Sequence, residues 1–180
     1  MGYRNREIEK KFEIKNGWRY DATAKTVKCC LRKLIKKIIH GDSTDIYFNT
    51  PKSIKADFAR VRMMPHGEAQ MTVKHSDKGS TTNRVEIDVD VKDPAQAIAI
   101  CTQFFGLPAR SVRKRYSVFF LDKKDTNVSI YKVQGDHRIF LEIEARDIKK
   151  VERITKKLKK AIDLHHEKKS IYQLFVKGRK

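Results

Sequence analysis

Strict alternation of polar and apolar residues is the main pattern of this chain, and it predicts a protein rich in β-strands. In a strand, successive side chains point to opposite faces. In residues 6–15 one face is largely apolar, and the other carries Glu7, Glu9, Lys11 and Glu13. Residues 84–91 repeat the pattern, with Val85, Ile87, Val89 and Val91 on one face and Arg84, Glu86, Asp88 and Asp90 on the other.

The same pattern predicts further strands, and helical spacing of apolar residues predicts three helices between them. We expect the helices at residues 23–40, ended by Gly41; at residues 94–105, capped by Asp93; and after Asp147. A final apolar segment, residues 170–176, should dock on the folded chain. The other expected strands are residues 45–50, 58–63, 70–74, 112–121, 128–133 and 138–145.

Charged residues at strand spacing recur in six of these strands. The anions are Glu7, Glu9, Glu86, Asp88, Glu142 and Glu144. The cations are Lys11, Arg60, Arg62, Lys74, Arg84, Arg113 and Arg115. A single polar strand face is typical of a solvated surface. Six of them, with largely apolar opposite faces, favour a curled sheet whose charges line its interior and whose helices cover its outside.

Such an interior is stable only when its charges neutralise one another or hold ions and a ligand. Clustered carboxylates supply hard oxygen ligands for Mg²⁺ or Mn²⁺. Arginine and lysine bind phosphate directly. Together these groups can neutralise the charge that develops on a transferring phosphoryl group, with a water or a ligand hydroxyl as nucleophile.

Composition agrees with an anionic ligand. Lysine and arginine number 41 against 22 aspartates and glutamates in 180 residues, which gives a formal net charge of +19. The three cysteines form no disulfide framework or zinc-binding spacing, so a reducing cytoplasm is the simplest expected location. No apolar run approaches membrane-spanning length, and no membrane partner is expected.

The ordered motifs of the chain resemble those of the CYTH family, also called triphosphate tunnel metalloenzymes. Glu7-Ile8-Glu9-Lys10-Lys11 matches the family's Glu-x-Glu-x-Lys signature, which alone is weak. The matching motifs extend over nearly the whole chain. Thiamine triphosphatases, class IV adenylyl cyclases and inorganic triphosphatases are the members of the family that the chain resembles. The other motifs are Asp45-Ile46-Tyr47-Phe48, Arg60-Val61-Arg62, Thr72-Val73-Lys74, Arg84-Val85-Glu86, Arg113-Lys114-Arg115, Phe140-Leu141-Glu142-Ile143-Glu144 and Ser170-Ile171-Tyr172.

The resemblance implies an α+β fold: a single domain over residues 1–180 with an eight-stranded antiparallel β-barrel, a charged tunnel flanked by helices. It implies Mg²⁺ or Mn²⁺ as cofactor and assigns roles to individual residues. Lys74 and Tyr47 would activate water, with Glu86 helping to bind metal or orient its water. The implied metal ligands are Glu7, Glu9, Glu86, Asp88, Glu142 and Glu144. The implied triphosphate-binding residues are Lys11, Arg60, Arg62, Lys74, Arg84, Arg113, Arg115 and Lys168.

One position departs from the family pattern. Where members often carry an aspartate in the strand before Glu142, this chain has Tyr131 or Lys132, which weakens a second metal site. The expected activity is hydrolysis of inorganic triphosphate, ATP or a similar triphosphate. A class IV adenylyl cyclase and a non-catalytic binder of triphosphate or triphosphate-ended RNA stay open as alternatives. The sequence does not indicate an oligomeric state, and family analogy alone allows a dimer.

Overall fold

The computed structural model describes residues 3–76, 83–122 and 126–177; the side chains of residues 3–7, 66, 76, 83 and 84 lie outside the description. The strands are β1 (Tyr3–Ile14), β2 (Lys37–Phe48), β3 (Phe58–Met63), β4 (Ala69–Ser76), β5 (Asn83–Val91), β6 (Arg110–Phe120), β7 (Thr126–Val133), β8 (Ile139–Ala145) and β9 (Leu164–His166). The helices are α1 (Tyr20–Leu31), α2 (Pro94–Phe105) and α3 (Ile148–Leu158), with short turns η1 (Pro65–Gly67) and η2 (Gln173–Lys177).

The chain divides into two compact units, and the strands β1, β2 and β6 each contribute residues to both units. Unit 1 comprises Met1–Arg6, Asp42–Lys114 and Lys169–Lys180; unit 2 comprises Glu7–Gly41 and Arg115–Lys168. The hydrogen-bonded strand order is β5-β4-β3-β2-β6 in unit 1 and continues as β6-β7-β8-β1-β9 in unit 2. The strand pairs β1–β8, β2–β3, β3–β4, β4–β5 and β7–β8 are antiparallel.

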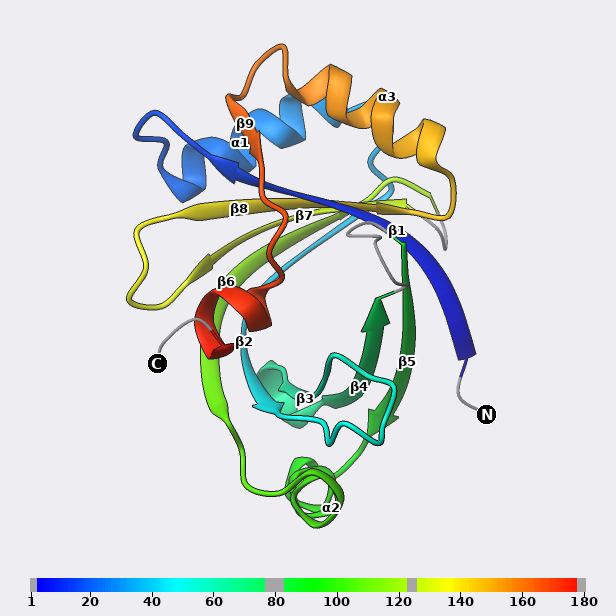
Figure 1. Cartoon of the computed structure of the whole chain (residues 1–180). Helices are drawn as coiled ribbons and strands as arrows, with labels where there is room; N and C mark the ends of the chain where they lie inside the picture. The colour runs from blue at the N-terminus through cyan, green and yellow to red at the C-terminus, as the bar shows by residue number, and fades with distance from the viewer. Residues whose placement is uncertain (1–2, 77–82, 123–125, 178–180) are drawn as a thin grey trace. The chain divides into compact units, whose positions relative to one another are not determined.

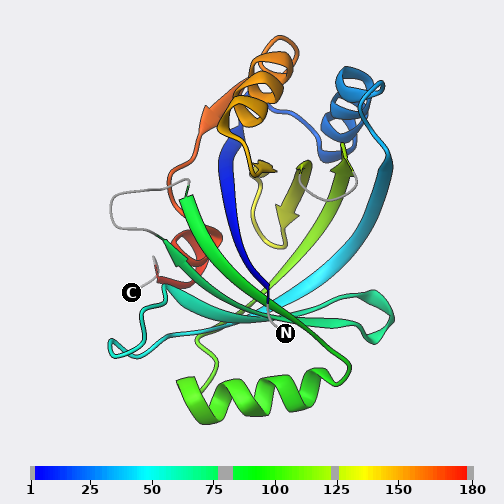
Figure 2. The same ribbon diagram turned by 90° about the vertical axis from the view of Figure 1, so that its right-hand side faces the viewer.

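In unit 1, α2 covers the apolar face of the strands, as Figure 2 shows. Phe48, Val61 and Cys101 are among the residues of this core, and all three are fully buried. The Asp93 side chain caps α2 by accepting hydrogen bonds from the backbone N–H groups of Ala95 and Gln96, as the sequence predicts. The opposite face of the same strands is therefore left for polar side chains.

The C-terminal segment docks on unit 1, which confirms the expectation for residues 170–176. Tyr172 stacks on Phe58 with ring centroids 5.1 Å apart, and its ring lies 5.9 Å from that of Tyr47. The Arg110 guanidinium donates a hydrogen bond to the carbonyl oxygen of Phe175 at 2.6 Å. The apolar tail is thus part of the unit 1 core.

In unit 2, α1 and α3 lie side by side over one face of the strands, as Figure 1 shows. Val27 of α1 and Leu158 of α3 pack with Phe12, Leu141 and other strand residues in one buried cluster. The alternation of β1 places its apolar side chains on this covered face. Glu9, Lys11 and Glu13 consequently point to the other face.

The expected helix over residues 23–40 is wrong in its second half. α1 ends at Leu31, and β2 begins at Lys37. The apolar residues Leu34, Ile35 and Ile38 suit either element, and β-branched Ile38 and Ile39 favour a strand. Gly41 ends no helix but lies within β2, where an added Cβ would come 3.0 Å from the Tyr116 hydroxyl.

The fold class expected from the sequence, an antiparallel sheet with a few helices, is confirmed. Among the described residues the sheet has nine strands rather than eight. The additional one, β9, is only three residues long and pairs with β1.

Candidate functional site

The polar face of unit 1 is built from cross-strand neighbours. Asp45 of β2 lies opposite Arg62 of β3, and Arg60 of β3 lies between Tyr47 and Thr72 of its two neighbouring strands. Directly opposed residues have side chains close enough to interact. The next strand pair continues the pattern, with Thr72 opposite Asp88 and Lys74 opposite Glu86.

Asp45 is the centre of this face and is fully buried. Arg62 donates two hydrogen bonds to its carboxylate, at 2.8 and 3.2 Å, and Lys114 Nζ lies 2.9 Å from Oδ2. Burial alone would raise the pKa of Asp45, but the nearby cations outweigh it and hold the pKa well below its usual value. Asp45 therefore fixes two cations in place, and sequence reasoning did not single it out.

Glu86 neutralises the other cations of this face. Its carboxylate lies 2.8 Å from Lys74 Nζ and 3.7 Å from an Arg60 nitrogen. Thr72 accepts a hydrogen bond from Arg60 at 2.9 Å and donates one to Asp88 at 2.6 Å. Burial, and then the charge of Glu86, raises the pKa of Asp88. Among the described residues, the buried Arg60 Nε has no hydrogen-bond partner.

Tyr47 is buried within unit 1 and protonated at neutral pH. Its hydroxyl donates to Asp45 Oδ2 at 3.4 Å, and its ring packs edge-on against Phe58. Burial raises the pKa of Tyr47, and the negative charge of Asp45 adds to the effect. The sequence resemblance couples Tyr47 to Lys74; the structure gives Asp45 as a partner of Tyr47 and Glu86 as a partner of Lys74.

The cation that β6 contributes to this face is Lys114, which corrects the choice of Arg113 and Arg115. Because side chains alternate along a strand, Arg113 and Arg115 point to the face opposite Lys114. The Arg115 side chain is 64% exposed and lies 3.8 Å from Asp21. Burial, and then repulsion by Arg62, lowers the pKa of Lys114 to about 8.

The polar face of unit 2 is built around facing carboxylates. Glu9 of β1 lies directly opposite Glu144 of β8, and Lys11 lies opposite Glu142. Glu9 and Lys11 are only 5% and 4% exposed. Lys11 Nζ lies 3.2 Å from Glu142 Oε1. Like charges that face each other across a ladder destabilise a sheet, so the Glu9–Glu144 position favours a bound cation.

Two side chains of β7 hold the carboxylates of β8. The Tyr131 hydroxyl donates to Glu142 Oε1 at 2.7 Å, and the Asn127 amide donates to Glu144 Oε2 at 2.8 Å. Tyr131 therefore shares the polar face at the position where the family pattern has an acid, whereas Lys132 is exposed. Strand alternation alone would have pointed to Asn127.

This set of donors fits a hard divalent cation by its chemistry. Glu9, Glu142 and Glu144 offer carboxylate oxygens, and Mg²⁺ is usually held by one or two carboxylates together with waters and substrate phosphates. Within the part of the chain that the structure describes, no three acidic, histidine or cysteine side chains are grouped closely enough to hold a metal by themselves. The residues present thus suit a cation that also takes ligands from the substrate.

Three predicted residues lie elsewhere or outside the description. Lys168 is exposed, just after β9 in unit 2. The side chains of Glu7 and Arg84 lie outside the described residues. Their expected roles in metal and triphosphate binding stay predictions.

A comparison with protein-family models identifies the family of this chain. The model of the CYTH domain matches residues 5–175. This chain belongs to the CYTH family. CYTH proteins act on triphosphates such as ATP or inorganic triphosphate, and they generally use divalent metals. No curated protein sequence matches the chain significantly.

Solved structures share the CYTH fold at low sequence identity. The PH1012 protein from Pyrococcus horikoshii is 20% identical, with a TM-score of 0.69 over 93% of this chain and 98% of its own. HpAC1 from Hippeastrum, a candidate adenylyl cyclase with a dominant triphosphatase activity, is 15% identical, with a TM-score of 0.69 over 96% of both chains. Among the described residues, none of the helices has the length and apolar character needed to cross a bilayer.

Proposed function

We propose that this CYTH protein is a metal-dependent triphosphatase that hydrolyses inorganic triphosphate or a nucleoside or other organic triphosphate. The observation that carries the proposal is the pair of facing carboxylates, Glu9 and Glu144, beside the buried Lys11. A binder of phosphate alone would gain from cations and lose from these carboxylates, whereas a metal-dependent enzyme needs both.

In the proposed reaction, the cations of unit 1 bind and orient the phosphate chain. Arg60 and Arg62 suit two-pronged contacts with phosphate oxygens, and Lys74 and Lys114 add point charges. The unpartnered Arg60 Nε supports this role, because a buried donor without an acceptor costs free energy that a ligand oxygen would recover. Each cation would exchange part of its contact with Asp45 or Glu86 for a phosphate oxygen.

Glu9 and Glu144, with Glu142 beside them, would hold the divalent ion. When bound, Mg²⁺ or Mn²⁺ supplies Lewis-acid neutralisation of the phosphoryl charge. Glu86, 2.8 Å from Lys74, is the carboxylate of unit 1 that could accept a proton from an attacking water. Tyr47, with its raised pKa, would act as a hydrogen-bond donor rather than as a base.

A class IV adenylyl cyclase is the second candidate, in which a ribose hydroxyl attacks the α-phosphate and pyrophosphate leaves. The structural likeness to HpAC1 favours considering it, because that protein is a candidate cyclase with a dominant triphosphatase activity. A non-catalytic binder of triphosphate or triphosphate-ended RNA is the third candidate.

A product-resolved assay tests the proposal. The protein is offered inorganic triphosphate, ATP, thiamine triphosphate and 5′-triphosphorylated RNA with Mg²⁺ or Mn²⁺, and orthophosphate, pyrophosphate and cyclic AMP are measured separately. We expect orthophosphate release that stops on metal chelation. Cyclic AMP with stoichiometric pyrophosphate would establish the cyclase instead, and binding without turnover of any substrate would establish the binder.

A further inference from the structure

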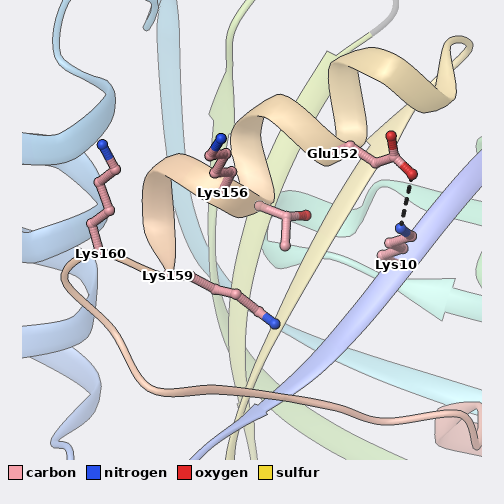
Figure 3. A pocket seen from close by; sticks show the side chains of 6 residues that line it. Lys10, Glu152, Lys156, Lys159 and Lys160 are labelled. Carbon is pink, nitrogen blue, oxygen red and sulfur yellow. Dashed lines mark ion pairs between the residues drawn. The ribbon is translucent and has the colours of Figure 1, made fainter.

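A basic pocket lies on the helix-covered side of unit 2, away from the carboxylates described above. It has a volume of about 410 Å³. Figure 3 shows the side chains around it, which come from β1, from α3 and from the turn that follows α3. The lining residues are Lys10, Glu152, Thr155, Lys156, Lys159 and Lys160.

Lys10 is a charged residue on the largely apolar face of β1. It occupies the face on which Ile8 and Phe12 pack against the helices, and its ammonium lies 3.7 Å from Glu152. Glu152 is the one carboxylate among the lining residues and is itself 61% exposed. The pocket therefore keeps an excess of positive charge after this pair is counted.

Several lysines lie close together at the C-terminal end of α3 and in the turn that follows it. Val151, Ile154 and Leu158 anchor α3 to the core, and cations near its C-terminus are favoured by the helix dipole. Lys156 and Lys160, however, are four residues apart, and like charges at this spacing repel each other. A bound anion would therefore reduce the repulsion within this cluster.

The positive field reaches beyond the pocket. Burial lowers the pKa of His166 on β9, and the charges of Lys10, Lys168 and Lys159 lower it further. Lys160 lies in the turn that follows α3. The exposed surface of α1 and its C-terminal end adds the cations Lys25, Lys28, Arg32 and Lys33.

We propose that this pocket binds phosphodiester groups of single-stranded nucleic acid, with the strand continuing over the basic surface of α1 and α3. Lysines that point in different directions suit successive phosphates of a chain, whereas one compact anion is better held by converging arginines. An anionic membrane is a poorer fit, because the described lining offers no aromatic or large aliphatic side chain for insertion. The proposal does not depend on the reaction proposed above.

Fluorescence anisotropy with a labelled 20-nucleotide single strand tests the proposal. The RNA and DNA strands carry a 5′-hydroxyl, so that no triphosphate is offered. We expect binding whose logarithm falls with the logarithm of salt concentration with a slope of about −3, as four phosphate contacts on a single strand require. The variant Lys156→Gln/Lys159→Gln/Lys160→Gln should bind at least tenfold more weakly at low salt, with a slope of about −1.

A matched control carries the same charge change elsewhere. Lys52, Lys55 and Lys92 are exposed residues of unit 1, and the triple glutamine variant at these positions should keep most of the affinity and the full slope. Equal weakening in both triple variants, or none in either, would overturn the proposal. Hydrolysis of inorganic triphosphate by the pocket variant should equal that of the unmodified protein, which separates this test from that of the proposed reaction.

A single substitution should act in the opposite direction. Glu152→Gln removes the one carboxylate of the lining and should tighten binding about threefold, while Glu68→Gln on unit 1 should not. Vesicles of phosphatidylserine and phosphatidylcholine provide the membrane arm. If the pocket variant lost vesicle binding and kept its affinity for both oligonucleotides, the ligand would be a membrane surface and the proposal would be wrong.

Discussion

The polar faces of the two units carry similar residue types in opposite arrangements. In unit 1 each opposed pair joins unlike groups, such as Asp45 with Arg62 and Lys74 with Glu86. In unit 2 one opposed pair joins two carboxylates, Glu9 and Glu144. The first face is already neutralised by its own side chains, whereas the second favours a cation from solution.

Because of this difference, the two polar faces suit different kinds of ligand. The cations of unit 1 are ordered before a phosphate arrives, because Asp45 and Glu86 hold them, so little side-chain entropy is lost on binding. The facing carboxylates of Glu9 and Glu144 in unit 2 would gain stability from a divalent ion. Substitutions in the two units should consequently affect different properties: metal dependence in unit 2, and stability and its pH dependence in unit 1.

The largest expected effect is on activity, from Glu9→Gln in unit 2. The substitution keeps the size of the side chain but removes the charge proposed to bind metal, and we expect turnover to fall by about a hundredfold to a thousandfold, the size of losing one electrostatic contact to the transition state. The circular dichroism spectrum should not change. Glu13→Gln, on the same strand face, is the matched control and should keep most of the activity. Full turnover in Glu9→Gln would contradict the metal role.

In unit 1, Asp45→Asn should instead reduce stability. The carboxylate is fully buried and neutralises Arg62 and Lys114, so removal of its charge leaves two partly buried cations without this counter-charge. We expect the free energy of unfolding to fall by about 3–5 kcal/mol, as for other broken buried ion pairs. Urea denaturation measures this value. A loss of under about 1 kcal/mol would mean that Asp45 does not hold the cations of this face.

The pH dependence of stability in unit 1 should follow Lys114. Burial lowers its pKa to about 8 in the folded chain, against about 10.4 when unfolded, so the folded protein releases this proton first. The cost of the buried charge is present below pH 8 and disappears as pH rises toward about 10.4. Relative to Lys114→Met, the unmodified protein should therefore gain up to about 3 kcal/mol between these pH values. Urea denaturation at several pH values gives the difference, and a relative loss would refute the assignment.

The sequence predicts the strand faces of both units well, because one apolar face per strand makes the alternation unambiguous. This is why Glu9, Arg60, Lys74 and Glu86 fall on the polar faces as expected. Alternation gives no such answer around Lys114. Arg113, Lys114 and Arg115 are all basic, so both faces of β6 are charged and the pattern does not show which face is the polar face of unit 1.

Two further features depend on tertiary packing and leave weak signals in the sequence. Leu34, Ile35 and Ile38 satisfy helical and strand patterns alike, and only strand pairing decides that β2 starts at Lys37. The central position of Asp45 depends on Arg60 and Arg62 of β3 and Lys114 of β6, and no local sequence pattern brings these strands together. The one sequence feature that could have indicated Asp45 is its position two residues before Tyr47, on the same face of the same strand.

The smallest expected effect returns to unit 2, where Tyr131 replaces the acid typical of the family. Tyr131→Phe removes the hydroxyl that donates to Glu142 Oε1 at 2.7 Å and keeps the ring stacked on Phe140. We expect the free energy of unfolding to fall by about 1 kcal/mol, the net contribution of one hydrogen bond. Because Glu9 and Glu144 are untouched, the metal concentration for half-maximal activity should change less than in Glu9→Gln. A metal requirement altered as strongly as in Glu9→Gln would instead make Tyr131 part of the cation site, and the two faces would then differ less than their opposed pairs indicate.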